Sequence, residues 1–100
     1  MAAYMIFIRE GAVFDASAME RYSGLNREHA GSYVERFGIK PLAVYGALEA
    51  IEGEAPDGVV LLEFPTMAAA RAWYASDEYQ AAIPHRMAGA NYRAFLFEGL

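Results

Sequence analysis

The sequence contains no cysteine, a single lysine (Lys40) and no long hydrophobic run. The absence of cysteine excludes disulfides, thiolate nucleophiles and cysteine-based zinc sites. No apolar run approaches the roughly 18 residues that a membrane-spanning helix needs, so the membrane is not an expected partner. The N-terminal segment MAAYMIFIRE has no basic region before its apolar run, which predicts a strand and not a signal peptide. Without a targeting segment, the cytoplasm is the expected location.

The charge balance argues against nucleic acid as a partner. Eight lysines and arginines are outnumbered by 13 acidic residues, which gives a formal net charge of −5. Binding to a phosphate backbone needs clustered basic residues, whereas the arginines here are scattered among acids. The 100 residues are 56% hydrophobic and 14% aromatic, enough to bury the core of one domain that spans residues 1–100.

Sequence patterns for a metal or a cofactor are also missing. The two histidines, His29 and His85, are far apart and belong to no His-x-x-x-His or Glu-x-x-His pattern. There is no Gly-x-Gly-x-x-Gly segment, no Walker A loop and no serine in a nucleophile elbow. The sequence therefore predicts neither a metal site nor a bound cofactor.

Apolar patterning predicts the order β-α-β-β-α-β. Strands are predicted at Ala3–Arg9, Leu42–Glu52, Val59–Phe64 and Tyr92–Glu98, and helices at Ala16–Phe37, from Thr66 to about Ser76, and across Tyr79–Ala88. With right-handed crossovers, this order predicts an α+β, ferredoxin-like fold: a four-stranded antiparallel sheet with its helices on one face.

Several residues are predicted to mark the ends and irregularities of these elements. Asp15 or Ser17 is expected to cap the first helix, and Gly38 to end it. Gly46 is expected to mark a bulge or a close backbone approach in the second strand. Pro84 is expected to kink or restart the last helical segment.

Both faces of the predicted sheet are apolar. In the first strand Tyr4, Ile6 and Ile8 point to one side, and Met5 and Phe7 to the other. Two helices can cover only one face, and an antiparallel sheet with its other face in water should alternate apolar and polar residues. The simplest cover for the second face is another copy of the chain, so we expect a homodimer with the sheets packed face to face.

One candidate site lies on the apolar side of the first helix. At about 100° per residue, Asn26 and His29 fall within the apolar arc between Tyr22 and Tyr33. One interpretation is a structural polar network inside a core, because buried polar groups need partners. The other is a pocket between the helix and the sheet, in which His29 would be the general acid or base. The sequence leaves both open.

A second candidate lies in the segment RAWYASDEYQAAIPHR, residues 71–86. Trp73 is expected chiefly to anchor the core, and Tyr79 to direct its hydroxyl toward a cleft. Arg86 has two interpretations. It is structural, as an ion-pair partner of Glu63 or Glu49 or as a surface guanidinium, or it binds a carboxylate or phosphate with its guanidinium fork.

The segment EFPTMAAARAWYASDEYQAAIPHR, with a last strand that ends in FEG, resembles the signature of the domain-of-unknown-function 1330 family. LAVYGALEAIEG is similar to that family's second strand and following turn. The resemblance covers nearly the whole chain and implies a bacterial protein and a dimeric α+β barrel, with sheets packed face to face. Gly46-Ala47 and Gly38-Ile39 stand where the family usually has Gly-Gly, and Ser76-Asp77 where it usually has Ser-Pro.

The resemblance implies no settled activity. Relatives in the superfamily include cofactor-free monooxygenases and lactone isomerases, whose pockets lie between the helices and the concave sheet. This likeness is at the level of the fold, and a fold does not define a function.

Two functional hypotheses follow. The first is a homodimer that binds a small organic molecule with an anionic group, with cofactor-free enzymatic activity left open. In it His29 supplies acid or base catalysis, Arg86 anchors the anion, and Tyr22, Asn26, Trp73 and Tyr79 contact the ligand. The second is a non-catalytic sensor or assembly module in which the same residues form the core. An open pocket with His29 and Arg86 on its wall would favour the first.

Overall fold

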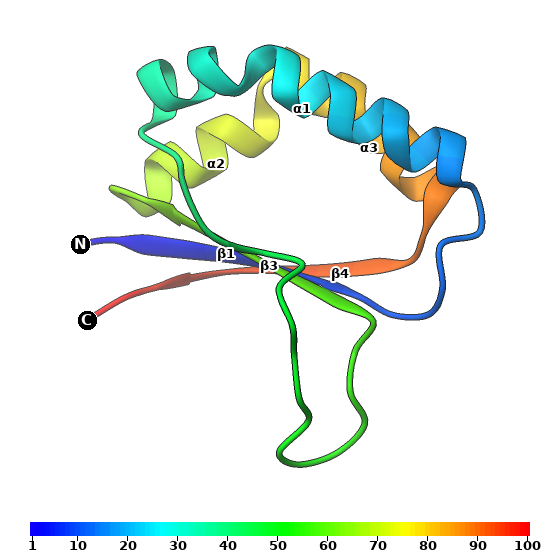
Figure 1. Cartoon of the computed structure of the whole chain (residues 1–100). Helices are drawn as coiled ribbons and strands as arrows, with labels where there is room; N and C mark the ends of the chain where they lie inside the picture. Colours follow the sequence, from blue (N-terminus) through cyan, green and yellow to red (C-terminus); the bar gives the residue numbers. More distant parts are fainter.

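Four strands form one antiparallel sheet, and three helices cover one of its faces (Figure 1). The computed structural model describes residues 1–100. Strands β1 (Ala3–Arg9), β2 (Lys40–Val44), β3 (Gly58–Phe64) and β4 (Tyr92–Glu98) pair in the order β2-β3-β1-β4, and the helices are α1 (Ala16–Phe37), α2 (Met67–Ala75) and α3 (Asp77–Gly89). The predicted ferredoxin-like α+β fold is confirmed.

Helix α1 begins and ends at capping residues. The Asp15 carboxylate accepts a hydrogen bond from the Ala18 N–H at 3.0 Å, so Asp15 and not Ser17 is the N-cap. At the other end Gly38 adopts a left-handed conformation with φ of 66°, and its N–H donates to the Val34 carbonyl at 2.9 Å. This cap turns the chain from α1 directly into β2.

Replacing Gly38 with alanine is expected to lower the free energy of unfolding by about 1–2 kcal/mol, because an L-residue is strained in the left-handed region. The new Cβ would also lie 3.0 Å from Cδ and Cγ of Pro65. Urea unfolding measures the change. Gly31→Ala is the matched control, since no atom lies within 4 Å of a Cβ there, and it is expected to be neutral or stabilising. Equal loss in both variants would refute the account of the cap.

The second strand is shorter than the sequence predicts. The predicted strand continues to Glu52, but β2 ends at Val44, and Gly46–Asp57 forms an irregular loop. Tyr45 has a positive φ of 52° and turns the chain out of the sheet. The apolar residues at 47–51 resemble a strand in the sequence, but β3 begins only at Gly58 and offers them no partner.

Two further irregularities differ from the prediction. The β-bulge lies between Pro41 and Ala43 and not at Gly46. Pro84 lies within α3, which continues through it to Gly89. Pro84 has no N–H to donate to the Gln80 carbonyl. Both residues are exposed, so water can donate that hydrogen bond instead.

The hydrophobic core lies between the helices and the inner face of the sheet. Its buried residues are Met5, Phe7, Tyr33, Leu62, Phe64, Ala70, Trp73, Tyr79, Ala82 and Ile83. Trp73 is central to it, with ring contacts to Phe7, Phe64 and Tyr79. The expectation that Trp73 anchors the core is therefore confirmed. None of the three helices is long and apolar enough to cross a membrane.

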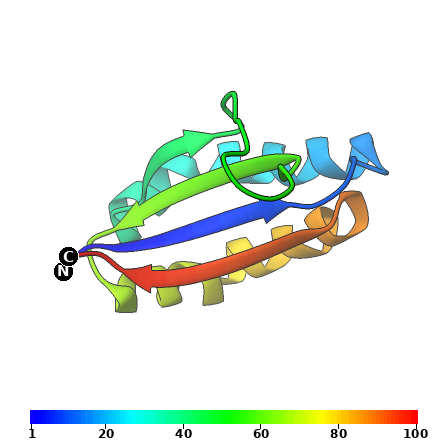
Figure 2. The ribbon, with the colours of Figure 1, turned by 90° about the horizontal axis from the view of Figure 1, so that it is seen from below.

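No helix covers the other face of the sheet (Figure 2), and the strand register shows that this face is apolar. The strand register places Ile6 between Leu61 and Phe95 on this face. Phe95 and Phe97 are 45% and 44% exposed on this face, and the neighbouring residues of β4, Ala94 and Leu96, point toward the helices. The predicted apolar outer face is confirmed, and we call it the open face, defined by Tyr4, Ile6, Ile8, Val59, Leu61, Phe95 and Phe97.

Candidate functional site

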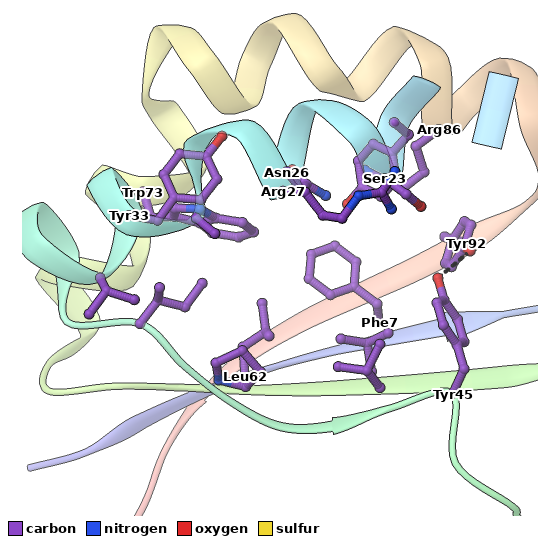
Figure 3. Close-up of a pocket in the computed structure, with 17 residues that line it drawn as sticks. Phe7, Ser23, Asn26, Arg27, Tyr33, Tyr45, Leu62, Trp73, Arg86 and Tyr92 are labelled. Carbon is purple, nitrogen blue, oxygen red and sulfur yellow. Dashed lines mark hydrogen bonds between the residues drawn. The ribbon is translucent and has the colours of Figure 1, made fainter. Parts of the chain in front are cut away.

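A cavity of about 440 Å³ lies between α1 and the inner face of the sheet (Figure 3). Small-molecule sites commonly have volumes of roughly 300–1,000 Å³. Twelve of its 17 lining residues are hydrophobic, and none is acidic. Val34 of α1 and Val44 of β2 line the cavity and are themselves exposed, so it opens to solvent between these two elements.

The cavity exists because α1 packs mainly along α3 and stands away from the β2 side of the sheet. The side chains that α1 directs into the gap include the short Ser23, Asn26 and Ala30, which do not fill it. Phe7 and Leu62 form the floor, and Trp73 lies at the end opposite Arg86 (Figure 3). The space is thus a product of helix placement and small side chains together.

Arg86 places a buried positive charge at one end of the cavity. Its side chain is only 6% exposed, and it lies on α3 with its guanidinium carbon near three aromatic rings. The distances to the ring centres are 5.5 Å for Phe7, 5.4 Å for Tyr92 and 6.0 Å for Tyr22. The ring faces offset part of the cost of burying a cation. They do not neutralise it.

No carboxylate pairs with Arg86. The ion pairs of the chain are Arg27–Glu20, Arg36–Glu78 and Arg93–Glu10. Glu63 points to the open face, and Glu49 lies in the exposed loop after β2, so neither of the partners considered from the sequence is available. The structural interpretation of Arg86 as an ion-pair partner is therefore wrong.

Four buried polar atoms of the cavity's lining residues have no hydrogen-bond partner. They are Asn26 Oδ1, Tyr33 Oη, Trp73 Nε1 and Arg86 Nε. Each such atom costs on the order of 1–3 kcal/mol relative to a satisfied one. The polar residues around the cavity therefore do not form the self-satisfied network that was one interpretation of the sequence.

One pair of tyrosines does satisfy itself. The hydroxyls of Tyr22 and Tyr79 share a hydrogen bond of 2.7 Å, with Tyr22 on the cavity wall and Tyr79 fully buried behind it. Burial raises the pKa of Tyr22, and the Tyr79 hydroxyl, the Asn26 amide and the Arg86 guanidinium partly offset the rise. Burial also raises the pKa of Tyr79. Both phenols are neutral near pH 7 and can act as hydrogen-bond donors.

Tyr45 and Tyr92 close the end of the cavity near Arg86 (Figure 3). Their hydroxyls are 2.6 Å apart, and the Arg9 guanidinium carbon lies 5.2 Å from the centre of the Tyr45 ring. Gly58 leaves room for that ring, because a Cβ there would lie 2.8 Å from its Cδ1. No sequence pattern indicates that Tyr45 lies here, since its position depends on where β2 ends.

His29 lies outside the cavity. It is turned about 60° around α1 from Asn26, toward α3, and its ring centre is 5.9 Å from that of Tyr33. It also lies near Glu78 of α3, whose pKa is lowered by its own backbone N–H, by Arg36 and, more weakly, by His29. A wall shared by His29 and Arg86, which would have favoured the first hypothesis, is therefore not found, because Arg86 lines the cavity and His29 does not. The expected acid or base catalysis by His29 has no place in this cavity.

Four other predicted site residues line the cavity, namely Tyr22, Asn26, Trp73 and Arg86. Tyr79 does not: it is fully buried and its hydroxyl bonds that of Tyr22 behind the wall, so the expectation that it faces a cleft is wrong. The prediction did not include Phe7, Ser23, Tyr45 and Tyr92. No group of three or more His, Asp or Glu side chains is placed to hold a metal ion.

Solved structures share this fold. A protein of unknown function from Rhodopseudomonas palustris, RPA0582, has a TM-score of 0.69 at 23% identity, over 99% of this chain and 82% of that chain. A dimeric ferredoxin-like protein of unknown function from Jannaschia sp. CCS1 has a TM-score of 0.69 at 18% identity, over 99% and 100%. SnoaB, a cofactor-independent oxygenase from Streptomyces nogalater, has a TM-score of 0.56 at 12% identity, over 99% and 92%. The chain thus has the architecture of the ferredoxin-like proteins.

A family model described as a domain of unknown function, DUF1330, matches residues 2–100. The chain belongs to this family, as the resemblance in its sequence predicts. No protein with a curated description matches the chain.

Proposed function

We propose that this protein is a homodimer in which each protomer binds a small, largely apolar organic anion in the cavity beneath α1. The observation that carries the proposal is Arg86, a buried cation on an apolar cavity wall with no carboxylate partner. The planar guanidinium binds a carboxylate through two parallel hydrogen bonds. The twelve hydrophobic lining residues would contact the apolar body of the ligand.

A ligand carboxylate at this place would remove the largest unfavourable term in the cavity. A buried cation without a partner costs several kcal/mol, which aromatic contacts reduce by only about 1–2 kcal/mol. The Tyr22 hydroxyl would add a second donor. If Tyr79 donates to the Tyr22 oxygen, the Tyr22 proton is free to bond the ligand.

Self-association is the second part of the proposal. The open face has an apolar centre at Ile6, Leu61 and Phe95, and no segment of residues 1–100 covers it. An apolar patch of this kind on an antiparallel sheet marks an interface. The Jannaschia protein of the same fold is described as dimeric, which supports the same assembly here.

Among the hypotheses for the function, the geometry favours binding over side-chain acid–base catalysis. No aspartate, glutamate or histidine lines the cavity, and burial raises the pKa of the tyrosines at its wall. Any catalysis would depend on Arg86 and Tyr22 to stabilise negative charge on a ligand oxygen. A binding protein or sensor needs only the same contacts.

Thermal unfolding with matched ligands tests the proposal. We expect 2-naphthoate to raise the melting temperature by several degrees, because a ligand at 100 times its Kd adds about 2.7 kcal/mol of stability. The neutral isostere 2-naphthamide is expected to have little effect, and alicyclic and aliphatic carboxylates of similar size map the shape that the cavity accepts. Equal stabilisation by acid and amide would contradict an anion site. No response to any carboxylate would contradict ligand binding here.

A further inference from the structure

The connection between β2 and β3 projects away from the helices (Figure 1). It comprises Gly46–Asp57, contains no helix or strand, and lies on the same side of the sheet as the open face (Figure 2). Connections between adjacent antiparallel strands usually have only about two to five residues. A loop of this length that leaves the body of the protein needs an explanation.

The base of this loop is held in place. At its start the Tyr45 N–H donates to the Val59 carbonyl at 2.9 Å. At its end Arg9 donates to the Asp57 carbonyl at 3.0 Å, and the Asp57 carboxylate accepts from the Gly11 N–H at 2.6 Å. The loop is therefore directed by the fold toward the side of the open face.

The projecting part of the loop carries apolar side chains that nothing in the chain covers. Ile51 is 84% exposed and Leu48 is 41% exposed. Scattered exposed hydrophobic residues are ordinary, but these two lie on a loop that projects on the side of the apolar open face (Figure 1). A partner that covers the open face would also meet the loop.

The area of the sheet leaves room for the loop in the interface. The three seven-residue strands are about 23 Å long and the four strands side by side are about 19 Å wide, so the flat outline of the sheet is on the order of 400 Å². A stable interface buries about 800 Å² of accessible surface on each partner. Side chains raise the accessible area of the sheet above its flat outline, and the loop is the adjoining surface that can enlarge the interface further.

Charge favours a second copy of this chain as the occupant. The loop carries four acidic residues, Glu49, Glu52, Glu54 and Asp57, and no basic residue. Lys40 lies on the open side of the sheet, opposite Glu63 in the register, and belongs to none of the ion pairs within the chain. A copy of the chain thus offers both an apolar face and, at Lys40, a cation outside the chain's own ion pairs to an acidic loop with exposed apolar residues.

We propose that Gly46–Asp57 is a dimerisation arm, which in the homodimer lies over the partner's sheet and buries Leu48 and Ile51 against it. The inference rests on the proposed homodimer and adds a specific contact to it. Under two-fold symmetry each protomer gives one arm and receives one, so every arm contact occurs twice. The acidic side chains of the arm lie toward the positive charge at Lys40 of the partner subunit.

Photo-crosslinking tests the contact directly, because the chain has no cysteine and one introduced thiol is unique. Ile51→Cys labelled with benzophenone maleimide is expected to give a covalent dimer on irradiation. Met87→Cys is the matched control: Met87 is 64% exposed on α3, on the helix side, and its label is expected to give none. A label at position 51 that links only within its own chain would overturn the arm.

Sedimentation velocity over a dilution series then separates the arm from the dimer. We expect Ile51→Glu to raise the dimer Kd at least about tenfold, and Met87→Glu to leave it unchanged, with circular dichroism to verify that both variants are folded. A wild-type dimer whose Kd is the same in Ile51→Glu overturns the arm and leaves the homodimer standing. A monomeric wild type at micromolar concentration overturns the homodimer and the arm with it.

Discussion

Ile6→Lys is expected to convert the proposed homodimer to a monomer at micromolar concentration. Ile6 lies on the central strand β1, between Leu61 and Phe95, at the middle of the open face. In a symmetric sheet-to-sheet dimer both copies of the new lysine would be buried near each other. Burying an unpaired cation costs several kcal/mol, and there would be two of them, so the dimer Kd should rise at least about a thousandfold.

Analytical ultracentrifugation measures this change. Met87→Lys, which places the same charge on the exposed side of α3, is the matched control and is expected to stay dimeric. Far-ultraviolet circular dichroism should show that Ile6→Lys remains folded, because the core lies on the other face of the sheet. A folded Ile6→Lys variant that sediments as a dimer would show that the open face is not the interface.

Arg86→Met is expected to stabilise the protein and to abolish the proposed preference for anionic ligands. The unbranched methionine removes a buried charge that has no carboxylate partner and keeps much of the packing against Phe7 and Tyr92. Replacement of buried charged groups by hydrophobic residues of similar size often stabilises proteins by about 1–4 kcal/mol. Loss of charge-assisted hydrogen bonds of about 1.5–3 kcal/mol should weaken carboxylate binding at least tenfold.

Two measurements together test this prediction: urea unfolding without ligand, and calorimetric titration with 2-naphthoate. Arg27→Met is the matched control, since Arg27 also lines the cavity but is exposed and pairs with Glu20. It is expected to change stability by no more than about 0.5 kcal/mol and binding only slightly. Arg86→Met with lower stability and unchanged binding would identify Arg86 as a structural cation of the core.

Much of the fold could be predicted because its signals are local. Alternation in AYMIFIR and in VVLLEF determines which side chains share a face, whatever the rest of the chain does. The caps at Asp15 and Gly38 depend only on residues within one turn of the helix ends. The exception was the predicted strand Leu42–Glu52, which ends at Val44. A strand needs a neighbouring strand to pair with, and the residues of the segment itself do not show whether one is present.

The candidate site was harder to predict, because the cavity is lined by residues from several helices and strands and depends on how these elements pack together. The apolar arc of α1 includes both Asn26 and His29, and only the packing of α1 along α3 puts the first in the cavity and the second outside it. Tyr45 and Tyr92 meet across β3 and β1, far apart in the chain. No spacing in the sequence indicates that contact.

The element order, the two apolar faces of the sheet and the family could all be predicted from the amino-acid sequence, because periodicity and motif are properties of neighbouring residues. Three features are visible only in the folded chain: Arg86 has no carboxylate partner, His29 lies outside the cavity, and the loop after β2 projects on the side of the open face. Each depends on the distance between groups from different elements. Those distances arise from the packing of the helices on the sheet, so local sequence patterns cannot indicate them.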